Sequence, residues 1–64
     1  MNYDREMSLM LASFRQTDET TVVVHEYATG FLVRVMDNST CAYIGDAVRF
    51  DDAMAAVAYA KEIS

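Results

Sequence analysis

Apolar residues near the start of the chain follow a helical spacing. They recur at intervals of three and four residues and form one stripe: Met7, Met10, Leu11 and Phe14. This spacing predicts a helix that begins at a cap on Asn2 or Asp4 and ends near Arg15. The centre of the same segment can also be interpreted as a strand. Residues 16–20 are polar and predict a loop.

The middle of the chain predicts a β-hairpin. Residues 21–27 contain three consecutive valines and read as a strand, and residues 31–36 form the returning strand. Residues 28–30 make the turn. Gly30 occupies the place where a three-residue loop needs a left-handed backbone.

Two registers of this hairpin differ in where they place one carboxylate. A three-residue loop pairs Tyr27 with Phe31, whereas a two-residue loop sets Glu26 beside Phe31, a costly position for a charge. We prefer the three-residue loop because it gathers Glu26 and Arg34 on one side. It turns one set of residues toward the helices: Thr21, Val23, His25, Tyr27, Phe31, Val33 and Val35. It turns the other set away: Val22, Val24, Glu26, Leu32, Arg34 and Met36.

A second turn leads into a third strand. Residues 37–40 are rich in side chains that bond to their own backbone, and the strand begins at Cys41. Gly45-Asp46 is either a bulge in one long strand that ends at Phe50 or a tight turn that creates a fourth short strand.

A capped helix follows this strand. Asp51 or Asp52 caps it and places a carboxylate at its positive end. The stripe predicted to face the sheet is Phe50, Ala53, Met54, Val57 and Ala60. Tyr59 is expected on the far side of this helix.

Together these elements predict an α+β fold of order α-β-β-β-α in a single domain, residues 1–64. The antiparallel sheet has three strands, or four if Gly45-Asp46 is a turn. Both helices are expected on one face of the sheet, which leaves the other face open. The alternative places one helix on each face and covers both.

Charge narrows the function. The chain carries ten Asp and Glu residues against five Lys and Arg, a net charge of −5. Nucleic acids and anionic membranes both attract Lys and Arg, so direct binding to either is disfavoured. A basic protein partner is expected instead.

The sequence also predicts a cytoplasmic protein. Residues 53–60, the longest apolar run, are far shorter than the ~20 residues of a membrane-spanning helix. Charges at positions 4–6 interrupt any secretory signal. Cys41 is the only cysteine, which fits a reducing compartment and predicts a buried thiol.

Catalysis lacks its usual groups in this sequence. His25 and Cys41 are the single histidine and the single cysteine, and the preferred register keeps them off neighbouring strands. We interpret His25 as a half-buried strand residue. Neither a zinc site, a calcium loop nor a phosphate-binding glycine loop can be assembled. We therefore expect no enzyme activity, cofactor or metal.

Two surfaces remain as candidates for binding. One is a group of acidic residues around the start of the last helix: Asp46, Asp51 and Asp52. A second acidic pair, Asp18-Glu19, lies in the first loop. The other surface is the open sheet face, whose surplus apolar residues predict a partner or a weak homodimer. The residues expected to bind the partner are Glu26, Arg34, Asp37, Tyr43, Asp46, Asp51, Asp52 and Tyr59.

In size, acidity, lack of catalytic groups and minimal α/β fold, the chain resembles the anti-CRISPR proteins, small inhibitors that phages and mobile elements use against host immunity. The likeness rests on these general features and includes no motif. It implies blockade of a CRISPR effector in a bacterial host, at its basic channel or at the site that reads the motif flanking the target. Carboxylates would then imitate phosphates locally.

A shorter pattern is similar to HicB-type antitoxins. It comprises the glycine-started strand at residues 30–35, the Gly45-Asp46 pair, and the Asp52-Ala53 pair that opens an alanine-rich helix. The spacing after Gly45-Asp46 is longer here than in that family. This resemblance implies a partial RNase H-like fold and binding of a cognate toxin through the exposed sheet face, as the alternative to inhibition.

Overall fold

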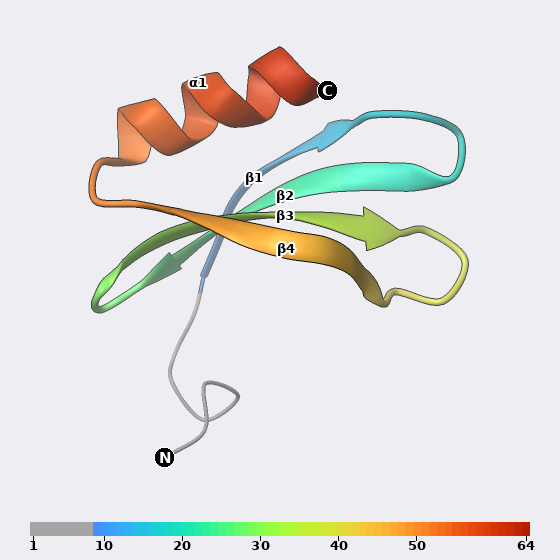
Figure 1. Cartoon of the computed structure of the whole chain (residues 1–64), viewed down its shortest axis with the longest axis horizontal. Coiled ribbons are helices and arrows are strands. Elements are labelled where there is room, and N and C mark those ends of the chain that lie inside the picture. The colour runs from blue at the N-terminus through green and yellow to red at the C-terminus, as the bar shows by residue number, and fades with distance from the viewer. Residues whose placement is uncertain (1–8) are drawn as a thin grey trace.

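A four-stranded antiparallel sheet covered on one face by a helix makes up the computed structural model, which describes residues 9–64 (Figure 1). The elements are β1 (Leu9–Arg15), β2 (Thr20–Tyr27), β3 (Gly30–Asp37), β4 (Tyr43–Phe50) and α1 (Ala53–Ile63). Each strand pairs with its neighbour in the chain. The α+β class, the antiparallel sheet and the C-terminal helix are confirmed. Within the described residues, no helix is long and apolar enough to span a bilayer.

Strand β1 occupies the segment predicted as the end of an N-terminal helix. Ala12 and Phe14 alternate onto the helix-covered face and pack against the core. A helix here would bury Met10 and Leu11, yet their side chains are 63% and 42% exposed. The strand forms because pairing with β2 satisfies its backbone while Ala12 and Phe14 pack, partly buried, against the core. The remainder of the predicted helix, residues 2–8, lies outside the described residues.

The β2–β3 hairpin has a two-residue loop, so the predicted three-residue register is wrong. Residues 28–29 form the loop, and Glu26 pairs with Phe31. The shift turns β2 over and brings Val22 and Val24 onto the face that α1 covers, where both are fully buried. Burial of two valines outweighs the cost at Glu26, because Glu26 lies near the strand end and keeps part of its surface in water. The orientation of β3 is the one predicted.

Gly30 is required by a close approach between this hairpin and β4. Its φ is +149°, and a Cβ atom there would lie 2.9 Å from Nη2 of Arg49 and 3.1 Å from the carbonyl oxygen of Phe50. The Arg49 guanidinium donates a hydrogen bond to the carbonyl oxygen of Thr29. Glycine therefore serves the contact with β4 and is not part of the loop.

Strand β4 is one strand with a bulge at Gly45-Asp46, the first of the two predicted alternatives. Pairing with β3 is regular on either side, and residues 45–47 are left opposite Arg34. Gly45 adopts a φ of +72°, which favours glycine. The fourth strand of the sheet is thus β1 and does not arise from a turn in this segment.

Helix α1 begins after Asp52, whose carboxylate accepts a hydrogen bond from the Ala55 backbone N–H at 3.0 Å. This confirms the predicted cap. The predicted inward stripe is rotated, because Ala56 and Ala60 are the fully buried positions, whereas Met54 is 80% exposed. Alanines at the centre of the contact let the helix lie close to the sheet.

The prediction that Tyr59 lies on the far side of this helix is wrong. Its ring packs on Phe50 with 5.4 Å between centroids, and it borders the core. Larger side chains such as Tyr59 therefore flank the alanine contact and fill the space where helix and sheet diverge.

Cys41 lies exposed in the turn before β4, so the predicted buried thiol is wrong. Its backbone N–H donates to the carbonyl oxygen of Asp37 at 2.7 Å, and its φ is +62°. Closure of this turn, and not burial in the core, fixes its position.

The alanine contact makes the helix–sheet distance a testable constraint. Replacing Ala56 with Leu inserts volume where no space exists, and we expect the free energy of unfolding to fall by about 1–3 kcal/mol. Ala58→Leu is the matched control, because Ala58 is exposed on the same helix. Urea unfolding of the two variants measures the difference; equal stabilities would contradict the proposed contact.

Candidate functional site

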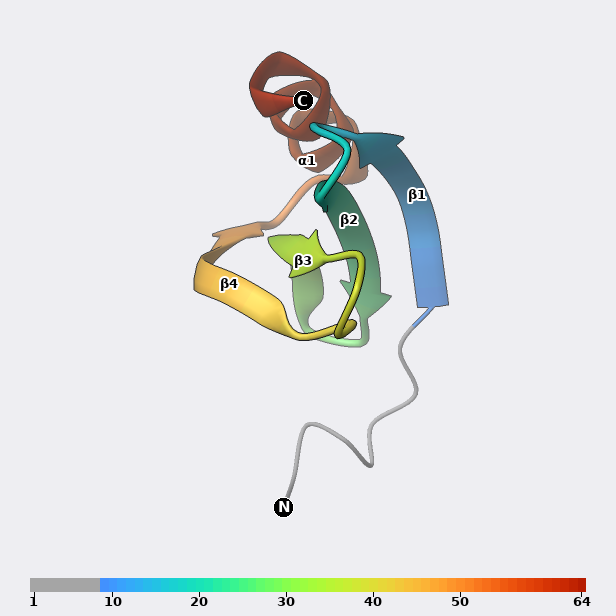
Figure 2. The ribbon, with the colours of Figure 1, turned by 90° about the vertical axis from the view of Figure 1, so that its right-hand side faces the viewer.

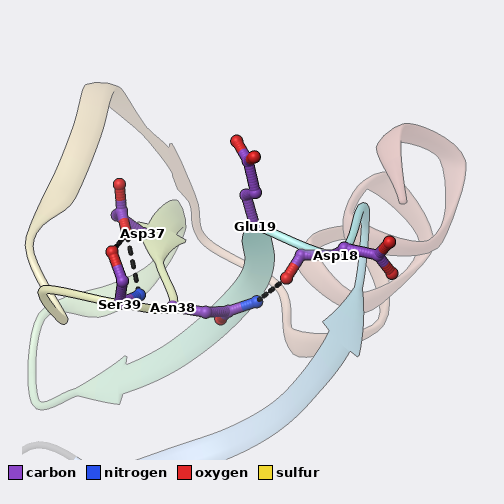
Figure 3. A pocket seen from close by; sticks show the side chains of 5 residues that line it. All are labelled: Asp18, Glu19, Asp37, Asn38 and Ser39. Atoms are coloured by element: carbon purple, nitrogen blue, oxygen red, sulfur yellow. Dashed lines mark hydrogen bonds between the residues drawn. The ribbon is translucent and has the colours of Figure 1, made fainter.

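Two turns at one end of the sheet bring acidic residues together. In this meander the β1–β2 and β3–β4 turns lie at the same end, on the right of Figure 1. They line a hollow of about 360 Å³ (Figure 3). We call the five lining residues the acidic end: Asp18, Glu19, Asp37, Asn38 and Ser39.

Asn38 ties the two turns to each other. Its backbone N–H donates to the carbonyl oxygen of Glu19 at 2.8 Å. Its side-chain amide donates to the carbonyl oxygen of Asp18 at 3.3 Å (Figure 3), and its Oδ1 accepts from the Thr21 hydroxyl at 2.6 Å. These bonds hold the backbones of the two separate turns next to each other.

Asp37 is held in its charged form by its own turn. Its Oδ1 accepts hydrogen bonds from the backbone N–H and the hydroxyl of Ser39, each at 2.8 Å, and from the Thr40 N–H at 3.3 Å. These donors, the Ser39 hydroxyl first, lower the pKa of Asp37 below its ordinary value of 3.8. Because the folded-state pKa is the lower one, this group stabilises the fold above pH 3.8 and the contribution is lost as pH falls through the folded pKa.

The acidic end presents its charges outward. Figure 3 shows the Glu19 and Asp37 side chains extending to one side, whereas Asp18 points away from both. Across residues 9–64, no three His, Cys, Asp or Glu side chains come close enough to hold a metal ion. The arrangement therefore suits contact with a surface more than coordination of a small ion.

A second group of side chains lies on the sheet face away from α1, and we call it the aromatic cluster: His25, Arg34 and Tyr43. The Tyr43 hydroxyl lies 3.1 Å from Nε2 of His25, and the Arg34 guanidinium carbon lies 4.0 Å from the centre of the Tyr43 ring. The cluster joins β2, β3 and β4. Val23 shares this face and is only 1% exposed, so this side of the sheet is packed as well.

His25 is more buried than the sequence suggested, and on the other face of the sheet. Only 9% of its surface is exposed. Burial and, to a smaller extent, the neighbouring Arg34 charge lower the pKa of His25 below 6.5, so it is neutral at neutral pH. The two-residue hairpin loop explains the change of face, because it inverts every side chain of β2.

The other predicted binding residues do not form one patch. Asp46 is exposed in the β4 bulge, and Asp51 pairs with Arg49 at 3.2 Å near the start of α1. About 16 Å of extended chain separates these two aspartates. Glu26 lies partly exposed on the helix-covered face. The expected cluster is therefore divided: Asp46 lies in β4, whereas Asp51 and Asp52 lie next to each other just before α1.

Asp52 has a structural role that the binding hypothesis did not include. Its carboxylate caps α1, and loss of such a cap costs about 0.5–2 kcal/mol. Reversing its charge would test the helix as well as any binding surface.

Sequence reasoning noticed Asp18 and Glu19 but did not join them to Asp37. The missing signal was the β1 strand. If residues 9–15 form a helix, nothing places the loop at residues 16–20 at the same end of the sheet as the turn at residues 37–40. If they form a fourth antiparallel strand, both turns must lie at that end.

No protein-family model, curated protein sequence or solved structure matches this chain.

The aromatic cluster predicts a pH dependence. Because the folded-state pKa of His25 is lowered, the unfolded chain binds more protons below pH 6.5, and the free energy of unfolding should decrease as pH falls from 6.5 toward the folded pKa. His25→Gln replaces the imidazole near Tyr43 with an amide that can still hydrogen-bond but cannot titrate, so the stability of this variant should change less over this window. Urea unfolding between about pH 7.5 and 5 measures both slopes. Identical slopes would show that His25 carries no such linkage.

Proposed function

We propose that this chain is a non-enzymatic binding protein that inhibits a basic, nucleic-acid-handling complex in the cytoplasm of a bacterial host by occupying its surface, as anti-CRISPR proteins do. The acidic end carries this proposal. Its carboxylates come from turns far apart in sequence, and the hydrogen bonds of Asn38 join the backbones of those turns. A cationic surface that approaches from the side of Glu19 and Asp37 would therefore meet these two carboxylates together.

Local charge supports docking on a basic partner. Among residues 9–64, Glu19 and Asp37 form no ion pair, and Asp18 lies 4.0 Å from Arg15 with both side chains exposed. Glu19 and Asp37 extend to the same side of the acidic end, so these two charges can act together on an approaching cation and steer association.

The contact is local and does not imitate a whole nucleic acid. The accessible surface of 4546 Å² carries five net negative charges, roughly one per 900 Å². Duplex DNA carries one charge per ~1.7 Å of its axis. The acidic end would thus stand in for a few phosphates at one site.

The state of His25 supports a role without catalysis. Its Nε2 is engaged by the Tyr43 hydroxyl, and the ring is buried beside the Arg34 charge. A general base needs access to the group from which it takes a proton. The aromatic cluster instead joins three strands.

A HicB-like antitoxin is the second candidate. Gly30 begins β3 and Asp52-Ala53 opens α1, so two parts of that local pattern fall at element boundaries. The third part, Gly45-Asp46, forms the bulge within β4. A basic toxin bound to the same chain would replace the CRISPR effector as the partner.

The acidic end can be tested by neutral isosteres. The variant to test carries three substitutions: Asp18→Asn, Glu19→Gln and Asp37→Asn. In a plaque assay, bacteria with an active CRISPR system express the chain and are challenged with a phage that this system targets. The wild-type chain should protect the phage from CRISPR immunity, and the triple variant should not. We expect at least about a tenfold fall in affinity for the purified effector, or ~1.4 kcal/mol, because three steering charges are removed.

Asp46→Asn, Asp51→Asn, Glu62→Gln is the matched control. It removes the same net charge from exposed positions outside the acidic end. The sequence alone placed Asp46 and Asp51 in the binding surface, but neither lines the acidic end, so this variant should retain activity. Circular dichroism checks that both variants fold. Equal losses of affinity in the two variants would show that net charge, and not the acidic end, is responsible. If the wild-type chain inhibits no CRISPR type, the antitoxin becomes the candidate.

A further inference from the structure

The two edges of the sheet differ in how they are protected. Figure 2 shows β1 and β4 on opposite sides of the sheet. Strand β4 is interrupted by residues 45–47 and carries Asp46 and Arg49, features that block pairing with another strand. Strand β1 has its own register shift between Met10 and Ala12, but residues 12–15 pair regularly. It carries no charge before Arg15, and Met10 and Leu11 are exposed. An uncharged outer strand of this kind is a template for another strand.

We propose that β1 pairs with β1 of a second copy, antiparallel about a two-fold axis at Ser13, which joins two four-stranded sheets into one. This inference goes beyond the proposed function and does not depend on it. The interface is isologous, so it closes as a dimer and does not propagate.

The register follows from the faces of β1. Residues 12–15 pair with β2 without irregularity, and residues 12–14 of this stretch face their counterparts across an axis at Ser13. A centre at Ser13 sets Ala12 of one copy opposite Phe14 of the other, a small side chain against a large one, both on the helix-covered face. A centre at Ala12 would instead oppose Phe14 to Met10, which lies on the other face because of the register shift between Met10 and Ala12.

Charge favours this antiparallel arrangement over a parallel one. Each acidic end lies at the Arg15 end of its own β1, so a parallel pair would place the two side by side. In the antiparallel pair they point in opposite directions, roughly 30 Å apart by the strand rise, well beyond the Debye length of ~8 Å. The short ladder predicts a weak dimer, of the size typical of transient contacts below ~1,200 Å².

Sedimentation equilibrium of the full chain between about 10 µM and 1 mM tests the dimer. The mean mass should rise from 7.2 kDa toward twice that value with concentration. It should rise further at high salt, because salt screens the repulsion between two molecules of net charge −5.

Ser13→Lys places two like charges on the axis and should keep the chain monomeric. Ala47→Lys, with the same charge change in the exposed β4 bulge, should dimerise like the wild type. A mass that stays at 7.2 kDa throughout, or equal effects of both variants, would overturn the proposal.

A cross-link provides a second readout that does not depend on affinity. In a Cys41→Ser background, Ser13→Cys should form a disulfide-linked dimer in oxidised glutathione, because opposed residues of antiparallel strands have Cα atoms ~4.5–5.5 Å apart, within disulfide range. Ala47→Cys in the same background is the control and should not cross-link. Equal cross-linking of the two would indicate random collision and contradict the axis at Ser13.

Discussion

The close packing of two alanines of α1 on the valines of β2 and β3 determines the rest of this small structure. Val22, Val24, Val33, Ala56 and Ala60 form the buried core, so no large side chain separates helix from sheet. A chain of about 60 residues buries only ~60% of its unfolded surface. It therefore has too few apolar side chains to build a packed layer of this kind on both faces of the sheet. Which face of β2 meets the helix therefore decides what the opposite face displays.

The opposite face is closed by a different means. No helix among the described residues covers it, yet Val23 is fully buried there and His25 nearly so. The aromatic cluster supplies the packing: a phenol hydrogen-bonded to imidazole, with a guanidinium over the phenol ring. Such contacts combine apolar area with satisfied polar groups, so they can cover a strand without excluding water from every side chain. They also secure β4, whose strand residues before Phe50 are exposed.

The elements that sequence reasoning placed correctly carry local signals. Asp52 caps α1, and the glycine of Gly45-Asp46 marks the β4 bulge, because each conformation needs a particular residue type. The errors lie where two long-range packings compete. Residues 9–15 fit both periods, and only pairing with β2 selects the strand.

The hairpin register shows the same competition in energetic terms. The placement of Glu26 favours one loop and the burial of Val22 and Val24 favours the other, and no local rule weighs one against the other. The acidic end was missed for this reason as well: it exists only once the number and register of strands are known.

The acidic end and the β1 edge are separated in a way that makes their roles nearly independent. Charges on exposed turns cost the fold little, since water and salt screen them. The hydrogen bonds of Asp37 lie within its own turn, and those of Asn38 join the two turns. In the proposed dimer the two acidic ends lie several Debye lengths apart, so neutralising one by a basic partner relieves little repulsion at the other. By reciprocity, dimerisation then changes the affinity for that partner little. Substitutions in either surface should therefore leave the other surface working. For that reason, a loss of partner binding after substitution in the acidic end cannot be attributed to a loss of the dimer.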